Sequence, residues 1–413
     1  MMVNSAKSGR RQIYILAFVL LVVMLGFGVV IPIIPFFIED MGAGGTELGL
    51  LVASYAIMRL IFGPIWGSLS DRVGRKPILM VGIFGYGITM ILFGLATKLW
   101  MLFVFRSLSG ILSSATSPTT MAYISDSTSE KDRGGGMGTL GAAIGIGTIL
   151  GPGFGGLLGG ESLSIPFFIA GGMSFLALLL IWLFLPESLS VEARRQASHK
   201  KRLTASDLWQ AMVGPIGILL GMAFLVSYAM TTFYSIFGLY ALQKFSYGTQ
   251  EVGAIMMVVG MVSALAQGVF TGPLTRRWGE AAVIKTTLLA TALGFIGISL
   301  GNTFVTFLIA IGFFTLATAL LTPAITALTS KRTTLEQGIS MGLSNSFMSL
   351  GRIAGPMVAG ITFDINIEYP NLSGALVLLV GFLASLVWVK KAAPTPKTAD
   401  KALESPQPAI SRH

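Results

Sequence analysis

The sequence predicts an all-α polytopic membrane protein whose twelve transmembrane helices form two pseudo-symmetric halves of six helices each. Three observations lead to this prediction. Only 11% of the 413 residues are charged and the mean hydropathy is +0.78, which is too apolar for a water-soluble domain. Apolar runs of about 20 residues, long enough to cross a bilayer as a helix, recur throughout the chain. Short motifs of the first half return in the second half.

The apolar runs define the twelve predicted spans. In the first half they cover residues 12–38, 47–68, 77–97, 99–124, 135–159 and 163–185. In the second half they cover residues 212–242, 249–272, 281–300, 303–328, 338–363 and 371–389. The first span is too long for a cleaved signal peptide and leads into a polytopic body.

The spans group into two halves joined by a polar segment. Residues 1–186 and 212–391 form the N-terminal and C-terminal six-helix halves, and residues 187–211 form a cytoplasmic linker between them. Residues 392–413 are rich in Pro, Ala, Ser and Lys, a composition typical of a disordered tail.

Basic residues mark one side of the membrane. Apart from Arg59, Arg106 and Arg352, which fall within predicted spans, only Lys98 and Lys244 lie on the side opposite the N-terminus. Cytoplasmic loops carry the excess of Lys and Arg in membrane proteins. The sequence therefore predicts a multi-pass protein of the cell membrane with both termini in the cytoplasm. The net charge of +10 then reflects topology and attraction to anionic lipid, not nucleic-acid binding.

The residue inventory excludes several chemistries. The chain has no cysteine, and its two histidines, His199 and His413, fall in a charged loop and at the terminus. A thiolate or imidazole metal site within the membrane is therefore excluded. No Walker A sequence and no Ser/His/Asp arrangement is present, which argues against direct use of ATP and against an enzyme. We expect no cofactor and no metal.

Motifs repeat between the halves at a nearly constant distance. Three residues of the loop after the second span return 205 residues later, as Gly272, Arg277 and Gly279. The pair Gly151-Pro152 returns 204 residues later as Gly355-Pro356. This ordered repeat is typical of two parallel halves related by an axis along the membrane normal. Arg276 replaces the acidic residue of the first loop, so the halves are not functionally equivalent.

The loop between the second and third spans combines glycines with a charge cluster. Gly67 is predicted to allow close helix contact, and Gly74 to adopt a left-handed backbone at a helix end. The charged residues are predicted to clamp neighbouring helix ends; they are Asp71, Arg72, Arg75 and Lys76. The alternative is an ordinary, positively charged cytoplasmic loop.

Two ionisable residues of the fourth span suggest a mechanism. An arginine at membrane depth costs about 2.5–3.5 kcal/mol, so Arg106 is predicted to face a polar cavity or a partner. Arg59 and Arg352 raise the same question, with snorkelling to an interface as the alternative. Asp126 ends the span, and we predict a latch between Asp126, Arg72 and Asp71 that breaks when the cytoplasmic side opens. The alternative for Asp126 is a solvated helix end.

The fifth span is crowded with glycine. Small residues at this density allow close helix contact without a hydrophobic driving force. Residues 151–156 also satisfy G-x-G-x-x-G, but no strand precedes them and no acidic residue follows at the required distance. A dinucleotide site is therefore rejected.

These motifs resemble those of a known family. Residues 67–76 (Gly-x-Leu-Ser-Asp-Arg-x-Gly-Arg-Lys) resemble the loop between helices 2 and 3 of the major facilitator superfamily. Arg106 with Gly110 resembles the fourth-helix motif of its drug:H⁺ antiporter-1 branch, and residues 151–156 (Gly-Pro-x-x-Gly-Gly) resemble the fifth-helix antiporter motif. The resemblance covers Tyr14 to Trp388 and is strongest to tetracycline and quinolone-type efflux pumps, whose eleventh helix resembles residues 355–364.

The resemblance implies the major facilitator fold and a monomeric secondary exporter. Its substrates would be small amphipathic molecules, such as drugs or tetracycline-like compounds, exchanged for protons by alternating access. The gating and coupling residues would be Asp71, Arg72, Gly74, Arg75, Lys76, Arg106, Asp126, Gly151, Pro152 and Gly156. Mid-span position suggests an apolar substrate cavity lined by Phe27, Tyr228, Met230, Phe233, Tyr234, Phe237 and Met256.

One departure from the resembled pumps concerns proton coupling. Those pumps carry carboxylates in the seventh and tenth helices, where this chain has Tyr234 and Ala319. No acidic residue falls near the middle of any predicted span. The remaining candidates lie at span ends, with Asp126 favoured; they are Glu39, Asp40, Asp71 and Asp126. The alternative function is a proton-independent facilitator or a lipid or metabolite flippase, and a membrane receptor is a more distant third.

Overall fold

The computed structural model describes residues 2–127, 130–190, 216–333 and 337–389. All regular structure in this part of the chain is helical. The predicted tail and most of the predicted linker lie outside the described residues, so their structure is not discussed further.

Seven helices build the N-terminal half. They are α1 (Met2–Asp40), α2 (Gly45–Val73), α3 (Arg75–Gly94), α4 (Leu99–Ser113), α5 (Thr116–Ser127), α6 (Glu130–Gly159) and α7 (Ile165–Phe184). The predicted fourth span is thus divided into α4 and α5. Pro118 accounts for the division, because its ring clashes with the carbonyl of Ser114 and it cannot donate a hydrogen bond there.

The C-terminal half repeats this arrangement. Its helices are α10 (Gly217–Phe245), α11 (Thr249–Leu265), α12 (Thr271–Trp278), α13 (Glu280–Leu300), α14 (Phe304–Arg332), α15 (Gln337–Ile365) and α16 (Tyr369–Trp388). A π-helical turn, η2 (Ala266–Phe270), joins α11 to α12. Eleven helical segments among the described residues are long and apolar enough to cross a membrane. The twelfth, α15, has the length of a span but carries Asn345, Arg352 and several serines.

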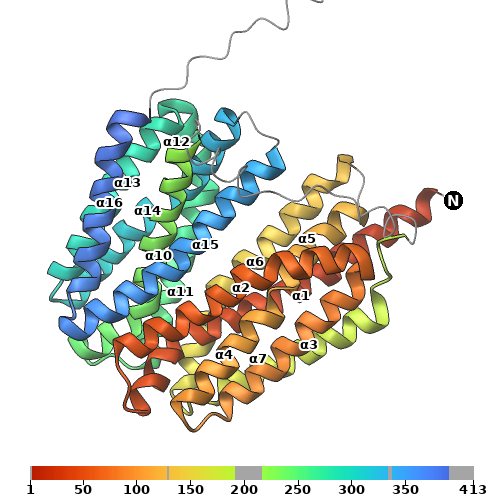
Figure 1. Cartoon of the computed structure of the whole chain (residues 1–413), viewed down its shortest axis with the longest axis horizontal. Helices are drawn as coiled ribbons and strands as arrows, with labels where there is room; N and C mark the ends of the chain where they lie inside the picture. Colours follow the sequence, from red (N-terminus) through yellow and green to blue (C-terminus); the bar gives the residue numbers. More distant parts are fainter. Residues whose placement is uncertain (1, 128–129, 191–215, 334–336, 390–413) are drawn as a thin grey trace, which may run out of the picture.

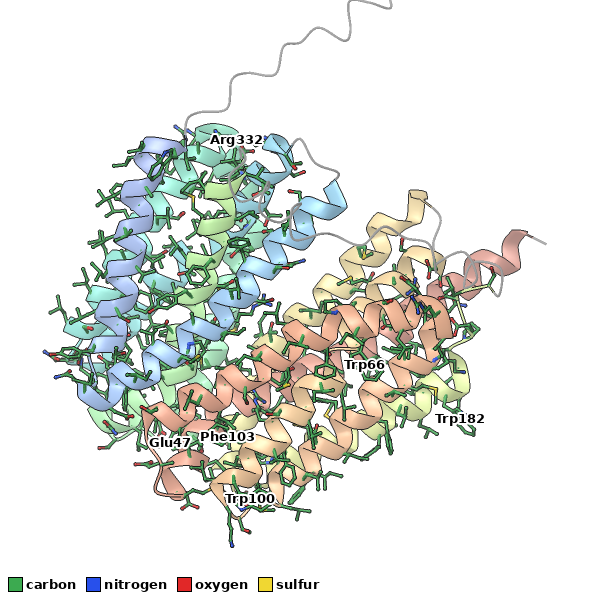
Figure 2. All side chains as sticks on the ribbon, viewed as in Figure 1. Glu47, Trp66, Trp100, Phe103, Trp182 and Arg332 are labelled. Carbon is green, nitrogen blue, oxygen red and sulfur yellow. The ribbon has the colours of Figure 1, made fainter. Side chains whose placement is uncertain are left out.

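The helix ends define two ends of the molecule. We call the end that holds the α2–α3 turn and Arg332 the basic end, and the end that holds the α1–α2 turn and Glu47 the opposite end. In Figure 1 the ribbons of the two halves meet near the opposite end and diverge towards the basic end, where α5 and α12 lie. Figure 2 labels Arg332 at the basic end and Glu47 and Trp100 at the opposite end.

Glycines bring the halves together at the opposite end. On α2 and α15, a Cβ at Gly49 would overlap the carbonyl oxygen of Pro356, and one at Gly360 would overlap that of Gly45. On α6 and α11, a Cβ at Gly156 would overlap the carbonyl oxygen of Thr249. The halves therefore touch backbone to backbone, as expected where lipid removes the hydrophobic driving force and small residues allow close packing.

Glycines on the same helices have open space at the basic end. A Cβ would meet nothing within 4 Å at Gly63 and Gly67 of α2, or at Gly138, Gly141 and Gly145 of α6. The expectation that Gly67 makes a close helix contact is therefore wrong for this conformation, because the halves are apart at that level. The protein is closed at the opposite end and separated at the basic end.

A substitution on α2 should test this closure. We expect Gly49→Val to force α2 and α15 apart, at an overpacking cost of about 1–3 kcal/mol. The chain has no cysteine, so spin labels attached to Leu95→Cys and Leu300→Cys report only the opposite end, where these side chains are 56% and 72% exposed. Double electron–electron resonance should show a longer distance between the two spin labels in Gly49→Val than in the parent.

Gly63→Val is the matched control, because it adds the same side chain to the same helix where nothing lies within 4 Å. Its distance distribution should equal that of the parent. Equal distributions for both variants would contradict the glycine contact.

Candidate functional site

A charge clamp holds the basic end of the N-terminal half. Arg75, at the start of α3, is only 7% exposed. Its guanidinium lies 2.6 Å from a carboxylate oxygen of Asp71 on α2 and donates a 3.0 Å hydrogen bond to Asp126 on α5. It also donates to the hydroxyl of Ser70 at 2.7 Å. One buried cation thus ties three helix ends together, with the charge-assisted bonds that are the strong ones in proteins.

The structure corrects the predicted latch. Arg75, and not the neighbouring Arg72, stands between Asp71 and Asp126, and Arg72 is exposed. Gly74 has a positive φ of +125°, as predicted, but its ψ of +159° lies outside the left-handed helical region; it ends α2 and starts α3. This sharp turn places residue 75 back over the end of α2, whereas residue 72 continues the helix outward.

Glu187 extends the clamp to the end of the sixth span. Its carboxylate accepts the backbone N–H groups of Arg75 at 2.9 Å and of Lys76 at 3.2 Å, at the N-terminus of α3. A carboxylate suits this place, because a helix N-terminus carries free N–H groups and a positive dipole end. The ammonium of Lys76 donates to the carbonyl oxygen of Trp182. Sequence reasoning missed Glu187, since more than a hundred residues separate it from Arg75.

A second carboxylate joins the two halves at the opposite end. Asp364, near the end of α15, accepts the N–H groups of Gly45 at 2.7 Å and Thr46 at 2.8 Å, and the hydroxyl of Thr46 at 2.5 Å. It caps α2 from the other half of the protein. One signal could have revealed it: α2 begins after Gly44, which has no side chain to cap the helix.

A tyrosine and two arginines form the polar centre of the N-terminal half. The guanidinium of Arg106 on α4 lies 4.4 Å from the ring centroid of Tyr55, and that of Arg59 lies 5.6 Å from it. The Tyr55 hydroxyl is 3.1 Å from the hydroxyl of Ser113, and the Phe27 ring is 6.1 Å from that of Tyr55. Arg106 therefore stacks on an aromatic ring that carries a polar hydroxyl, which is one part of the polar surroundings expected for an arginine within a span. The role of Tyr55 was not predicted from the sequence.

Several polar atoms around this centre lack partners. Arg106 is 5% exposed, and its Nε makes no hydrogen bond among the described residues. The same holds for the buried hydroxyls of Tyr86 and Ser109 and, further along on α5, for those of Thr116 and Thr119. Buried polar groups are normally satisfied, so this group of unpaired donors and acceptors is uncommon in an apolar interior.

The glycine motif of α6 contacts both halves. At Gly151 a Cβ would lie 2.7 Å from the Cα of Gly28 on α1, and the Pro152 ring packs against the same glycine. At Gly156 it would overlap α11 at Thr249 and Gly253. The helix therefore links its own half to the other half through consecutive turns.

Four of the residues predicted to line a substrate cavity are instead packed in the core. Their exposed fractions are 5%, 2%, 1% and 3% for Tyr228, Phe233, Phe237 and Met256. Phe233 packs its ring 4.9 Å from that of Phe314 and 5.1 Å from that of Phe237, which explains its burial. For these residues the prediction is corrected. The remaining three are partly buried and stay candidates; they are Phe27, Met230 and Tyr234.

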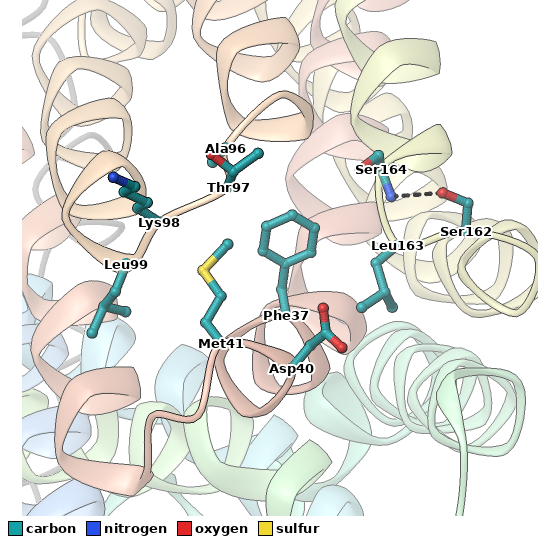
Figure 3. A pocket seen from close by; sticks show the side chains of 10 residues that line it. All are labelled: Phe37, Asp40, Met41, Ala96, Thr97, Lys98, Leu99, Ser162, Leu163 and Ser164. Carbon is teal, nitrogen blue, oxygen red and sulfur yellow. Dashed lines mark hydrogen bonds between the residues drawn. The ribbon is translucent and has the colours of Figure 1, made fainter.

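A cavity of about 710 Å³ opens at the opposite end, within the N-terminal half. The turns after α1, α3 and α6 form it, and Asp40 and Lys98 stand on its wall (Figure 3). Glu39 and Asp40 are exposed. The cavity does not reach the interface of the halves, and among the described residues no cluster of three or more His, Cys, Asp or Glu could hold a metal.

Comparisons with known proteins identify a matching family model and related proteins. The family model described as "Major Facilitator Superfamily" matches residues 16–301 and, again, 219–412. The chain is 34% identical to multidrug resistance protein 2 of Bacillus subtilis, over 90% of this chain and 93% of the relative. It is 29% identical to the quinolone resistance protein NorA of Staphylococcus aureus, over 91% and 96%.

Solved structures share the fold. A bacterial homologue of the human lysosomal transporter Spinster superimposes with a TM-score of 0.77 at 15% identity, covering 94% of this chain and 99% of the other. The human organic anion transporter MFSD10 superimposes with a TM-score of 0.67 at 20% identity, covering 91% and 99%.

Neutralising Arg75 should destabilise the basic end. We expect Arg75→Gln to lower the free energy of unfolding by about 1–3 kcal/mol, because Asp71 and Asp126 lose their common partner. Arg72→Gln removes the same charge one turn earlier from an exposed position and should have no measurable effect. Thermal unfolding of the purified protein in detergent checks both. A larger loss for Arg72→Gln would restore the original latch.

Asp364→Asn should loosen the opposite end. A neutral amide accepts weaker hydrogen bonds from the N–H groups of α2 than a carboxylate does. A hydrogen bond to a charged group contributes about 1.5–3 kcal/mol to stability. The spin-label pair at residues 95 and 300 should gain a longer distance component. Glu251→Gln is the control, because Glu251 caps only its own helix through Gly248. The capping role fails if the two variants give the same distribution.

Proposed function

The chain belongs to the Major Facilitator Superfamily, and from this premise we propose that it is a secondary active exporter that moves small amphipathic molecules out of the cytoplasm in exchange for protons. Relatives at about 30% identity are named for multidrug and quinolone resistance, and we extend that class of substrate to this chain. In this proposal it is a monomer in the cell membrane with both termini and the basic end in the cytoplasm.

One observation carries the proposal. The halves touch at glycines at the opposite end, while glycines on the same helices have open space at the basic end. An exporter that works by alternating access needs this asymmetry, with the mirrored contact in its second state. The free glycines Gly63, Gly67 and Gly145 are then the surfaces on which the halves would close at the cytoplasmic side.

The clamp at Arg75 supports a role in gating. It ties α2, α3 and α5 of one half, next to the surface that would close. Protonation of Asp126 would remove one of its two carboxylates, so the clamp gives a proton a way to change the end of α5. We therefore keep Asp126 as the coupling residue, with Asp71, Arg75, Gly74, Gly151, Pro152 and Gly156 as gating residues.

A proton-independent facilitator or flippase is the second candidate. One observation favours it: Tyr234 and Ala319 stand where the resembled pumps carry carboxylates, and no acidic residue falls near the middle of a span. The membrane potential would then supply the energy for a charged substrate, at about 2.3 kcal/mol per charge per 100 mV.

Proton counterflow separates the two candidates. Purified protein in proteoliposomes should acidify or alkalise the lumen when a transported drug is added, in step with drug flux. Asp126→Asn should uncouple the two, leaving drug movement with at least a tenfold smaller proton flux. Glu39→Gln, at an exposed carboxylate of the opposite end, should behave as the parent. Drug flux without proton movement in the parent protein would overturn antiport and favour the facilitator.

A further inference from the structure

We propose that the substrate is an amphipathic anion, an apolar body with a carboxylate or similar anionic group, and that Arg59, Arg106 and Arg352 receive its charge. The inference rests on the proposed transport function and specifies the substrate class of that transport. It depends on the charge inventory of the membrane interior and on the helix faces that meet between the halves.

The interior of the protein carries positive charge without matching negative charge. Its ion pairs among the described residues lie at helix ends: Arg75 with Asp71 and Asp126, Lys244 with Glu368, and Lys331 with Glu280. None involves an arginine within a span. Every acidic residue of the sequence lies at or beyond a span end, so the three arginines have no carboxylate at their level.

Arg106 is the most demanding of the three. It is 5% exposed, which rules out snorkelling to water. Its stacking on Tyr55 contributes about 0.5–2 kcal/mol, whereas an arginine within a span costs up to about 2.5–3.5 kcal/mol. Its Nε–H has no acceptor among the described residues. A guanidinium with an unused donor in this setting is a receptor for an anion.

Arg352 and Arg59 lie on the faces of α15 and α2 that meet. On α15, Arg352 is one turn from Pro356 and two turns from Gly360, and both of these contact α2. On α2, Arg59 falls on the face of Gly45, which contacts α15, because residues seven apart share a helix face. The two arginines therefore approach the interface from opposite halves, on the inner side of the closed contact.

Electrostatics links the three arginines through one ring. Arg106 and Arg59 both approach the Tyr55 ring, at 4.4 and 5.6 Å from its centroid, and Arg352 lies within electrostatic range of Arg59 across the interface. Arg352 is exposed, whereas Arg106 is buried. The positive potential thus runs from the open side of the interface into the N-terminal half, ending on the aromatic pair Tyr55 and Phe27.

This arrangement matches the chemistry of an amphipathic anion. Guanidinium groups bind carboxylates through two parallel hydrogen bonds, and a bound anion would offset the repulsion between like charges on the two halves. The apolar body would lie against Phe27, Tyr55 and the partly buried Met230 and Tyr234. A lipophilic cation would meet three positive charges and no negative one, which opposes its binding.

Three dansyl probes with one apolar chain test the sign of the charge. They end in a carboxylate, a methyl ester or an amine, and their fluorescence reports binding to the purified full-length protein in neutral detergent. We expect the acid to bind at least tenfold more tightly than the ester, and the amine most weakly. In Arg352→Gln the affinity for the acid should fall about tenfold, towards that of the ester, while the ester is unaffected.

Matched variants separate the site from general charge. Arg276→Gln removes an exposed arginine at the basic end and should leave all three affinities unchanged. Arg59→Gln should repeat the effect of Arg352→Gln. Both substitutions leave the buried Arg106 in place, so the test does not depend on whether an Arg106→Gln variant folds. Equal binding of acid and ester, or preference for the amine, overturns the anion site while leaving export of other drugs intact. Absence of binding by all three probes overturns both the anion site and the proposed export of amphipathic molecules.

The anion could also be the headgroup of a lipid, and competition distinguishes the two sources. Phosphatidylglycerol or phosphatidylcholine is added to the detergent micelles that contain the protein and the acid probe. Displacement by phosphatidylglycerol alone supports the site with an anionic lipid as its occupant. No displacement by either lipid supports the site with a small soluble anion as its occupant. Equal displacement by both contradicts recognition of charge.

Discussion

The contact of backbone with backbone at the opposite end is the constraint on which the rest of the structure depends. Gly45 and Gly49 of α2 meet Pro356 and Gly360 of α15 with no side chain between them. Lipid tails surround an apolar side chain as favourably as a neighbouring helix does, so the hydrophobic effect does not hold helices together in a membrane. Close backbone packing takes its place. The contact also fixes the register that places Arg59 and Arg352 on facing surfaces.

The two ends are held by different physical means, and this difference suits their tasks. The basic end uses ions: the buried Arg75 binds Asp71 and Asp126 within one half, through charge-assisted bonds that do not cross between the halves. The opposite end joins two halves, so it uses neutral glycine contacts and adds one carboxylate, Asp364, only at a helix N-terminus. The glycine contacts separate without leaving charges unpaired.

The sequence predicted the helices and the positive φ at Gly74, because hydropathy and a glycine at a helix end are local properties, and it predicted the two halves because their motifs repeat. The sequence could not show whether Arg72 or Arg75 binds Asp71 and Asp126. The two arginines are three residues apart, and the backbone turn at Gly74 decides which one lies over the end of α2. Phe233 and Phe237 look like cavity residues by position alone, and only the packing of α14 against α10 shows them to be core. Glu187 and Asp364 act on helices distant in sequence, which no local pattern reveals.

The missing carboxylates and the unpaired arginines are two parts of one charge balance. Where Tyr234 and Ala319 replace acids, the interior loses the groups that would attract a cation, and Arg59, Arg106 and Arg352 remain to attract an anion. An anion leaving a cell whose interior is negative moves with the field, which contributes about 2.3 kcal/mol per charge per 100 mV. A transporter of such a substrate needs less help from protons than one that expels cations against the same field. The sign of the interior charge therefore bears on the driving force as well as on recognition.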